Sequence, residues 1–275
     1  MPCKPRLEIT AEKIELPAAI RELWAFRDLL ICFVWTEITT KYRQTILGAV
    51  WAIIQPLATM LMLTVIFHKF LHAPTDGLPF AAFSYSALLC WQYFSSALTK
   101  SSQSVLTNAG ILKKIYFPRI ALPISSVVPQ LVDFAIALTV LGFVMCFYGI
   151  GINSRIVFLP FCVMLLMLPA LGAGLWLSAL QVRFRDVYHL LPLIIQLWFF
   201  ACPIGYALSA VPREYQGLYE LNPLVGAIEC FRWCLLGTQA NILQPVVLSS
   251  VVSLIVLISG AIFFQSAEGG FADFT

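Results

Sequence analysis

The strongest constraint on this chain is a run of apolar sequence that begins just after two closely spaced cations. Lys41 and Arg43 are followed by residues that carry no charge as far as Phe67. A run of this length matches the roughly 20 apolar residues that an α-helix needs to cross a bilayer core of about 30 Å. The pattern predicts that the chain leaves a charged membrane surface here and crosses the lipid as a helix.

Similar apolar runs recur along the chain, joined by short polar connections. The expected spans are about 46–67, 80–98, 121–148, 156–180, 190–208 and 244–264. Composition supports them, because 60% of the residues are hydrophobic and only 11% are charged, against roughly 25% charged in soluble domains. The runs are apolar on all sides, whereas the strands of a membrane β-barrel alternate with period two. We therefore expect an all-α integral membrane protein with six transmembrane helices.

The segment before the first span has an amphipathic pattern. Over 18–40, apolar residues recur at helical spacing. The opposite side carries Arg21, Glu22, Arg27, Asp28 and Glu37. This pattern predicts a helix at the membrane surface. A weak span is the alternative, but its charges would be costly at bilayer depth. We expect residues 1–45 to form a cytoplasmic arm and an interface helix.

Lysine and arginine are distributed unevenly among the connections. Thirteen of the 17 lie in the N-terminal segment and after the second and fourth spans. Loops rich in these residues stay on the cytoplasmic side, so the asymmetry predicts a cytoplasmic N-terminus. Six spans would return the tail, 265–275, to the same side, although the tail carries no Lys or Arg.

Motifs for nucleotide binding and catalysis are absent from the sequence. It contains no Gly-x-x-x-x-Gly-Lys-Ser/Thr loop, no His-Glu-x-x-His and no paired carboxylate set. The basic residues near membrane ends are explained by topology, so nucleic acid is not an expected partner.

Histidine and cysteine give no clear metal site. His68 and His72 lie one turn apart and could bind a metal, but without carboxylate or cysteine companions a wetted helix end is the favoured interpretation. The eight cysteines show no metal-ligand spacing and are interpreted as small apolar filler. Cys230 and Cys234, one turn apart on a helix, are poorly placed for a disulfide.

Three features inside the spans suggest more than lipid contact. Asp133 is the clearest ionisable residue in a span, and it either lines a polar pathway or pairs with a neighbouring helix. Aromatic residues crowd the second and fifth spans, as interfacial belts or as faces that stack on sugar rings. Ala170, Gly174 and Ser178 share one face of the fourth span, which predicts close helix packing.

Four stretches, in their order and spacing, together resemble one family. They are KYRQTILGAVWAIIQPL at 41–57, NAGILKKIYFPRIALP at 108–123, RFRDV at 183–187 and LNPLVGAIECFRW at 221–233. The chain resembles the membrane subunits of polysaccharide ATP-binding-cassette exporters, the ABC-2 type permeases. One departure is in the tail, where Phe271-Ala272-Asp273 is not preceded by the family's usual cations. A C-terminal contact through such cations is therefore unsupported.

The resemblance implies a single ABC-2 type transmembrane domain over 1–275, with short re-entrant outer helices before the last span. It implies a homodimer that works with two copies of a separate ATPase, which would use ATP and Mg, and no cofactor bound by this chain. The implied function is export of a lipid-linked polysaccharide, such as O-antigen, capsule or a teichoic-acid-like chain, across a bacterial cytoplasmic (inner) membrane. The alternatives are an ABC-2 exporter of a small lipid or drug and, more remotely, a membrane-embedded glycosyl or acyl transferase.

The resemblance and the residue patterns together predict three groups of functional residues. The group expected to couple to the ATPase is Asn108, Leu112, Lys113, Lys114, Tyr116, Phe117, Pro118, Arg119, Arg183, Arg185 and Asp186. An ordinary basic loop is the alternative for 108–119. The group expected to line the substrate pathway is Trp51, Gln55, Pro56, Tyr85, Trp91, Tyr93, Asp133, Trp198, Phe199 and Phe200. The group expected at an outer gate is Asn222, Pro223, Glu229 and Arg232. Pro56, which lacks a backbone donor, is expected to kink the first span.

Overall fold

The computed structural model describes residues 16–43, 50–72, 74–112, 114, 116–151, 153–239 and 242–268. All regular secondary structure in these ranges is helical, which confirms the expected all-α class. The first half contains α1 (Leu16–Ala25), α2 (Arg27–Arg43), α3 (Trp51–Leu63), η2 (Thr64–Phe70), α4 (Phe80–Thr107), α5 (Ala109–Leu112), α6 (Ala121–Val127) and α7 (Gln130–Phe147). The second half contains η3 (Ser154–Phe158), α8 (Leu159–Arg183), α9 (Val187–Phe200), η4 (Leu208–Ala210), α10 (Arg213–Glu220), α11 (Pro223–Leu235) and α12 (Leu243–Glu268).

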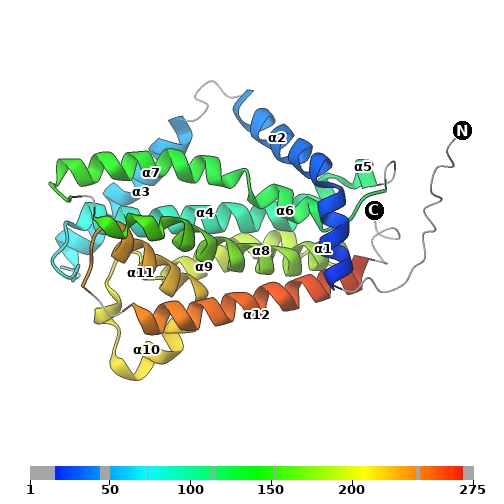
Figure 1. Cartoon of the computed structure of the whole chain (residues 1–275). Helices are drawn as coiled ribbons and strands as arrows, with labels where there is room; N and C mark the ends of the chain where they lie inside the picture. The colour runs from blue at the N-terminus through cyan, green and yellow to red at the C-terminus, as the bar shows by residue number, and fades with distance from the viewer. Residues whose placement is uncertain are drawn as a thin grey trace, which may run out of the picture.

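Four helical segments are long and apolar enough to cross a membrane. They are Trp51–Phe70, Ala121–Phe147, Ser154–Arg183 and Leu243–Glu268, and they correspond to four of the six expected spans. Figure 1 shows α4, α7, α8 and α12 running alongside one another, with α10 and α11 at one end and α1 and α5 at the other. The short helices expected before the last span are thus present as α10 and α11, which we call the outer hairpin.

The other two expected spans differ from the prediction in length and polarity. α4 runs to Thr107 rather than to residue 98. Its polar residues can remain helical because hydroxyls such as those of Thr99 and Ser104 donate hydrogen bonds to backbone carbonyls of the same helix. Its serines keep α4 below the hydropathy of the four segments. α9 is apolar but ends at Phe200, not at residue 208, and an irregular segment that contains Pro203 follows it.

α4 is the central helix of the molecule. Most of its residues from Phe80 to Val105 are buried, and α3, α6, α7, α8 and α11 all pack against it. Its buried hydroxyls are largely paired within the helix, as in Ser84 to the Phe80 carbonyl at 2.9 Å. A polar helix of this kind is stable in a membrane only when other helices shield it from lipid.

The small-residue face of α8 packs closely, as predicted. Ala170 and Ser178 are fully buried, and a Cβ on Gly174 would lie 2.3 Å from the Ser101 hydroxyl of α4. On another face of α8, a Cβ on Gly172 would lie 2.6 Å from the Leu257 backbone nitrogen of α12. Small residues thus bring both neighbouring helices against α8.

The expected interface helix is divided into α1 and α2 by a turn at Phe26. Its apolar side, including Phe26 and Phe33, packs on the cluster formed by Phe117, Leu122, Val182 and other residues. Pro56 lies inside α3 without ending it, and the expected kink stays a prediction. The tail motif 271–273 lies outside the described residues.

Candidate functional site

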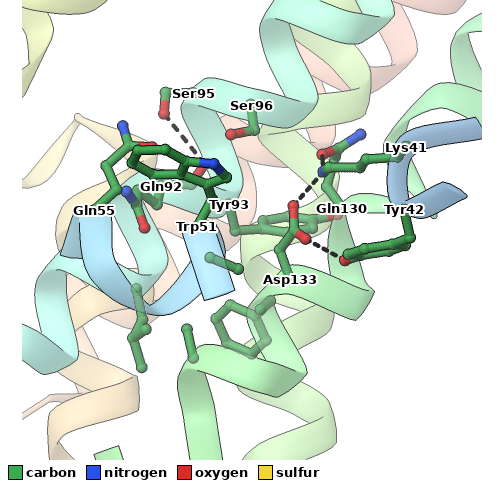
Figure 2. Close-up of a pocket in the computed structure, with 14 residues that line it drawn as sticks. Lys41, Tyr42, Trp51, Gln55, Gln92, Tyr93, Ser95, Ser96, Gln130 and Asp133 are labelled. Carbon is green, nitrogen blue, oxygen red and sulfur yellow. Dashed lines mark hydrogen bonds and ion pairs between the residues drawn. The ribbon is translucent and has the colours of Figure 1, made fainter. Parts of the chain in front are cut away.

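A cavity of about 310 Å³, lined by both polar and apolar side chains, lies between the end of α2 and the helices α3, α4 and α7. It is lined by Lys41, Tyr42, Trp51, Ala52, Gln55, Leu89, Gln92, Tyr93, Ser95, Ser96, Gln130, Asp133, Phe134 and Ala137. Figure 2 shows Trp51, Gln55 and Gln92 on one side and Lys41, Tyr42 and Asp133 on the other. Most of the polar groups are amides and hydroxyls, which can both donate and accept hydrogen bonds.

Asp133 is held by two residues of α2. Lys41 Nζ donates to one carboxylate oxygen and the Tyr42 hydroxyl donates to the other (Figure 2). Lys41 Nζ also donates to Gln130 Oε1 at 2.9 Å, one turn before Asp133 on α7. We call Lys41, Tyr42, Gln130 and Asp133 the clasp. Asp133 therefore pairs with a neighbouring helix and lines the cavity, and its place in a substrate pathway stays a prediction.

Charges on α2 and α4 surround the clasp. Burial raises the pKa of the Glu37 carboxyl above its ordinary value, although the positive charges of Lys100 and Lys41 act in the opposite direction. Burial, together with the hydrogen bond and charge of Asp133, also raises the pKa of the Tyr42 phenol well above its ordinary range. Tyr42 thus keeps its proton near neutral pH and acts as a donor to Asp133.

A second cavity of about 490 Å³ adjoins the first and reaches α9. The two share Lys41, Ser95, Ser96 and Gln130, and the second adds Thr99, Lys100, Pro192, Ile195 and Gln196. We call the two cavities together the polar groove. The groove follows one face of α4, on which Gln92, Ser95, Ser96 and Thr99 recur at helical spacing.

One hydroxyl at the groove is buried and unpaired. The Tyr93 side chain lines the first cavity and is 3% exposed, yet its hydroxyl has no hydrogen-bond partner among the described residues. A buried polar atom without a partner costs about 1–3 kcal/mol.

The outer hairpin is fastened by a buried arginine. Arg232 on α11 is 0% exposed and donates to Glu229 at 2.9 Å and to the Pro203 carbonyl at 2.7 Å. Its guanidinium carbon lies 3.5 Å from the centre of the Phe83 ring of α4. Asn222 caps α11 by accepting from the Leu224 amide at 3.2 Å, and it donates to the Ala201 carbonyl at 3.0 Å. The expected gate residues therefore lock the hairpin onto α4 and the turn after α9.

The opposite end of the molecule carries the residues expected to contact an ATPase. Phe117 is buried with its ring centre 5.4 Å from that of Phe33 on α2. The Arg119 side chain donates to the Glu268 carbonyl at the end of α12 at 2.7 Å. The Tyr116 side chain, 53% exposed, reaches Glu22 of α1 at 3.5 Å. This region thus joins the interface helix, the segment after α5 and the end of α12.

The other members of that group lie on or near the same end. Asn108 donates to the Ser104 carbonyl at 2.8 Å, and Leu112 packs beside the Phe117 cluster. Pro118 is buried, whereas Lys114, Arg183, Arg185 and Asp186 are exposed. Lys113 lies outside the described residues.

The chain matches a family model described as ABC-2 type transporter over residues 29–236, about three quarters of its length. The chain belongs to the ABC-2 type transporter family. The match begins in α2 and ends just after α11, so it includes the clasp, the groove and the outer hairpin. This family consists of transporter permeases rather than enzymes, and the chain is a membrane protein.

Several relatives of this ABC-2 chain align over most of its length. It is 28% identical to an O-antigen export system permease protein RfbA of Myxococcus xanthus, over 92% of this chain and 98% of the relative. A protein of the same name from Klebsiella pneumoniae is 26% identical over 90% and 94%. The polysialic acid transport protein KpsM of Escherichia coli is 26% identical over 71% and 76%.

The structure brings only part of the expected pathway of this ABC-2 chain together. Trp51, Gln55, Tyr93 and Asp133 line the first cavity. Tyr85 and Trp91 are instead buried among the helices. The Trp198 indole donates a hydrogen bond to the Asn222 side chain at 3.2 Å. These three side chains therefore stabilise the fold and do not line the first cavity. The others, Pro56, Phe199 and Phe200, do not line either cavity of the groove.

Sequence reasoning missed several groove residues. They are Lys41, Tyr42, Gln92, Ser95, Ser96, Thr99, Lys100, Gln130 and Gln196. The spacing of Gln92, Ser95, Ser96 and Thr99 could have indicated a polar face on the second span. His68, considered as a metal ligand, is exposed and stacks on Phe80 with ring centres 5.5 Å apart. No group of three metal-ligating side chains occurs within the described ranges.

Proposed function

We propose that this chain is the channel-forming permease subunit of an ATP-driven exporter of a lipid-linked polysaccharide. The family match supports transport, and the names of the relatives favour O-antigen or a similar polysaccharide. The observation that carries the proposal is the polar groove along α4, whose largely apolar walls carry a row of amides and hydroxyls. Sugars are dense in hydroxyl groups, and such side chains pair with hydroxyl groups in either direction.

The transport path would pass along α4. In this account α4 and α9 are the two remaining membrane spans, which makes six with the four apolar segments. Their lower hydropathy or shorter length is acceptable because they face a hydrated path and other helices rather than lipid alone. Trp51, which is 55% exposed, would offer its ring face to passing sugars.

The energy would come from a separate ATPase. Two copies of the chain would pair with two ATPase subunits, which bind ATP and Mg, and this chain would bind no cofactor. The contact surface would be the end that carries Tyr116, Phe117 and Arg119, together with the exposed Arg183–Asp186 turn. ATPase closure would push α2, and the clasp would transmit that push to α7 because Lys41 and Asp133 join the two helices.

The orientation follows the distribution of Lys and Arg. The coupling end and both termini would lie in the cytoplasm, and the outer hairpin would lie at the other face of a bacterial cytoplasmic membrane. The whole chain, 1–275, would act as one ABC-2 transmembrane domain.

Deletion of the gene tests the proposal directly. Lipid-linked glycan should accumulate on the cytoplasmic face of the membrane and disappear from the cell surface, and expression of the wild-type chain should reverse both changes. Normal surface glycan in the deletion strain, with a small lipid or drug retained instead, would favour the alternative ABC-2 exporter and overturn the polysaccharide proposal.

A further inference from the structure

We propose that Cys162 and Cys230 are an oxidisable thiol pair whose disulfide fastens the outer hairpin to α8. The two residues are 68 positions apart in sequence, on α8 and α11, and their sulfur atoms lie 3.1 Å apart. A disulfide bond is about 2.05 Å long. The sulfurs therefore need to approach by about 1 Å to bond.

The Cys162 thiol lies against two thiols of α11, those of Cys230 and Cys234. Cys162 is 1% exposed and Cys230 is 2% exposed, so each thiol faces the other rather than solvent. Cys234, one turn further on α11, donates to the Arg155 carbonyl at 3.1 Å. Cys32 and Cys146 are exposed on α2 and α7. Cys234 is thus the rival partner for Cys162, and a Cys234→Ser variant separates the two assignments.

The position of the pair in the membrane favours oxidation. This step rests on the proposed orientation, in which the start of α8 and the outer hairpin face away from the cytoplasm. Disulfides persist on that side, whereas cytoplasmic thiols are kept reduced. Because both thiols are buried among apolar helices, the oxidant must be small and lipid-soluble, and a membrane quinone has both properties.

The chemistry balances with a quinone as the two-electron acceptor. The Cys162 and Cys230 thiols lose one proton each and together give up two electrons as the S–S bond forms. The quinone takes up two electrons and two protons and becomes a hydroquinone. A dithiol such as dithiothreitol reverses the step by thiol–disulfide exchange.

The bond would complete the attachment of the hairpin. Arg232 already ties α11 to Phe83 of α4 and to Pro203, but these are non-covalent contacts that can break. A Cys162–Cys230 bond would add a covalent link to α8. If α11 must move for the path to open, oxidation stops export.

The test is thiol mapping of the wild-type chain in isolated membranes. The membranes are treated with a short-chain ubiquinone, free thiols are alkylated, and unreduced peptides are identified by mass spectrometry. We expect a Cys162–Cys230 linked peptide that dithiothreitol removes. It should be absent from Cys162→Ser and Cys230→Ser and retained in Cys234→Ser. No linked peptide, or one through Cys234 instead, would overturn the assignment.

Export is measured as a second readout in the same membranes or cells. Quinone treatment should stop export by the wild type, dithiothreitol should restore it, and Cys162→Ala should be insensitive. A linked peptide with unchanged export would contradict the claim that the disulfide stops export by restraining α11. Because thiol mapping needs no transport substrate, its outcome is independent of whether the chain exports a polysaccharide.

Discussion

An arginine–glutamate pair occurs at each end of the molecule, and the two pairs are built differently. At the outer end, the side chains of Arg232 and Glu229 are 0% and 8% exposed and 2.9 Å apart, within one helix. At the coupling end, Arg119 and Glu268 are 25% and 29% exposed and 4.0 Å apart, on different segments. The first pair is buried, and its arginine also contacts the Phe83 ring of α4. The second pair is partly accessible to solvent and joins the segment after α5 to the end of α12.

The difference indicates which ion pair costs more free energy to break. Removing one partner of a buried ion pair leaves an uncompensated charge and costs about 3–5 kcal/mol. The Arg119–Glu268 pair is only half-buried and its atoms are 4.0 Å apart, so it costs less free energy to break and can reform during a transport cycle. We therefore expect variants at the outer end to affect stability first and variants at the coupling end to affect export first.

Arg232→Ala should have the largest effect on stability. It leaves Glu229 buried without its partner and removes the bond to the Pro203 carbonyl, for a loss of about 3–5 kcal/mol. The measurement is the midpoint of thermal unfolding in detergent. Arg213→Ala, at an exposed position of α10, is the matched control. An unchanged midpoint for Arg232→Ala would show that the outer end is not locked.

Gly226→Ala should also destabilise the outer end, by about 1–3 kcal/mol. A Cβ at this position on α11 would lie 2.2 Å from the Pro245 carbonyl oxygen of α12. Gly217→Ala on α10 is the control, because nothing lies within 4 Å of a Cβ there. Equal midpoints for the two variants would mean that α12 can shift away from the added Cβ at little cost. That result would contradict the claim that the outer end is tightly packed.

Asp133→Asn tests the clasp between the two ends. The variant keeps the side-chain shape but removes the charge that pairs with Lys41, so we expect a loss of about 1–2 kcal/mol and a marked fall in export. Exchanging the charges with Lys41→Asp and Asp133→Lys together should restore part of the export. If Asp133→Asn exports normally at wild-type levels of protein, the clasp does not transmit motion.

Arg119→Glu should change stability least, by about 1 kcal/mol because it loses the bond to the Glu268 carbonyl, and still abolish export. It places a negative charge beside Glu268 and alters the surface expected to contact the ATPase. The measurements are membrane insertion, co-purification of the ATPase and surface glycan, with Arg213→Glu as the control. Normal co-purification and export would show that this end does not couple to an ATPase.

The sequence predicted the helical class, four of the membrane segments, the outer hairpin and the small-residue face of α8. These features depend on local composition, which hydropathy and spacing report directly. The full length of α4 was missed because Thr99, Ser102 and Ser104 look like a polar loop, although their hydroxyls bond back into the helix.

The site was predicted less well because its contacts are distant in sequence. Asp133 was identified as unusual, but its partners Lys41 and Tyr42 lie 92 and 91 residues away. The Cys162–Cys230 contact likewise spans 68 residues, whereas the sequence suggested only the unproductive pair Cys230 and Cys234. The aromatic residues Tyr85 and Trp91 looked suitable for sugars but are buried in the core.

Photocrosslinking tests the central claim, that the groove along α4 carries the polysaccharide, most directly. A photoreactive amino acid is placed at Gln92 in the groove and, as the control, at Phe143 on α7, which is 76% exposed and outside it. After illumination of exporting cells, the chain is purified and probed for attached glycan. We predict glycan on the Gln92 variant and none on the Phe143 variant. Glycan on neither, or equally on both, would contradict the claim.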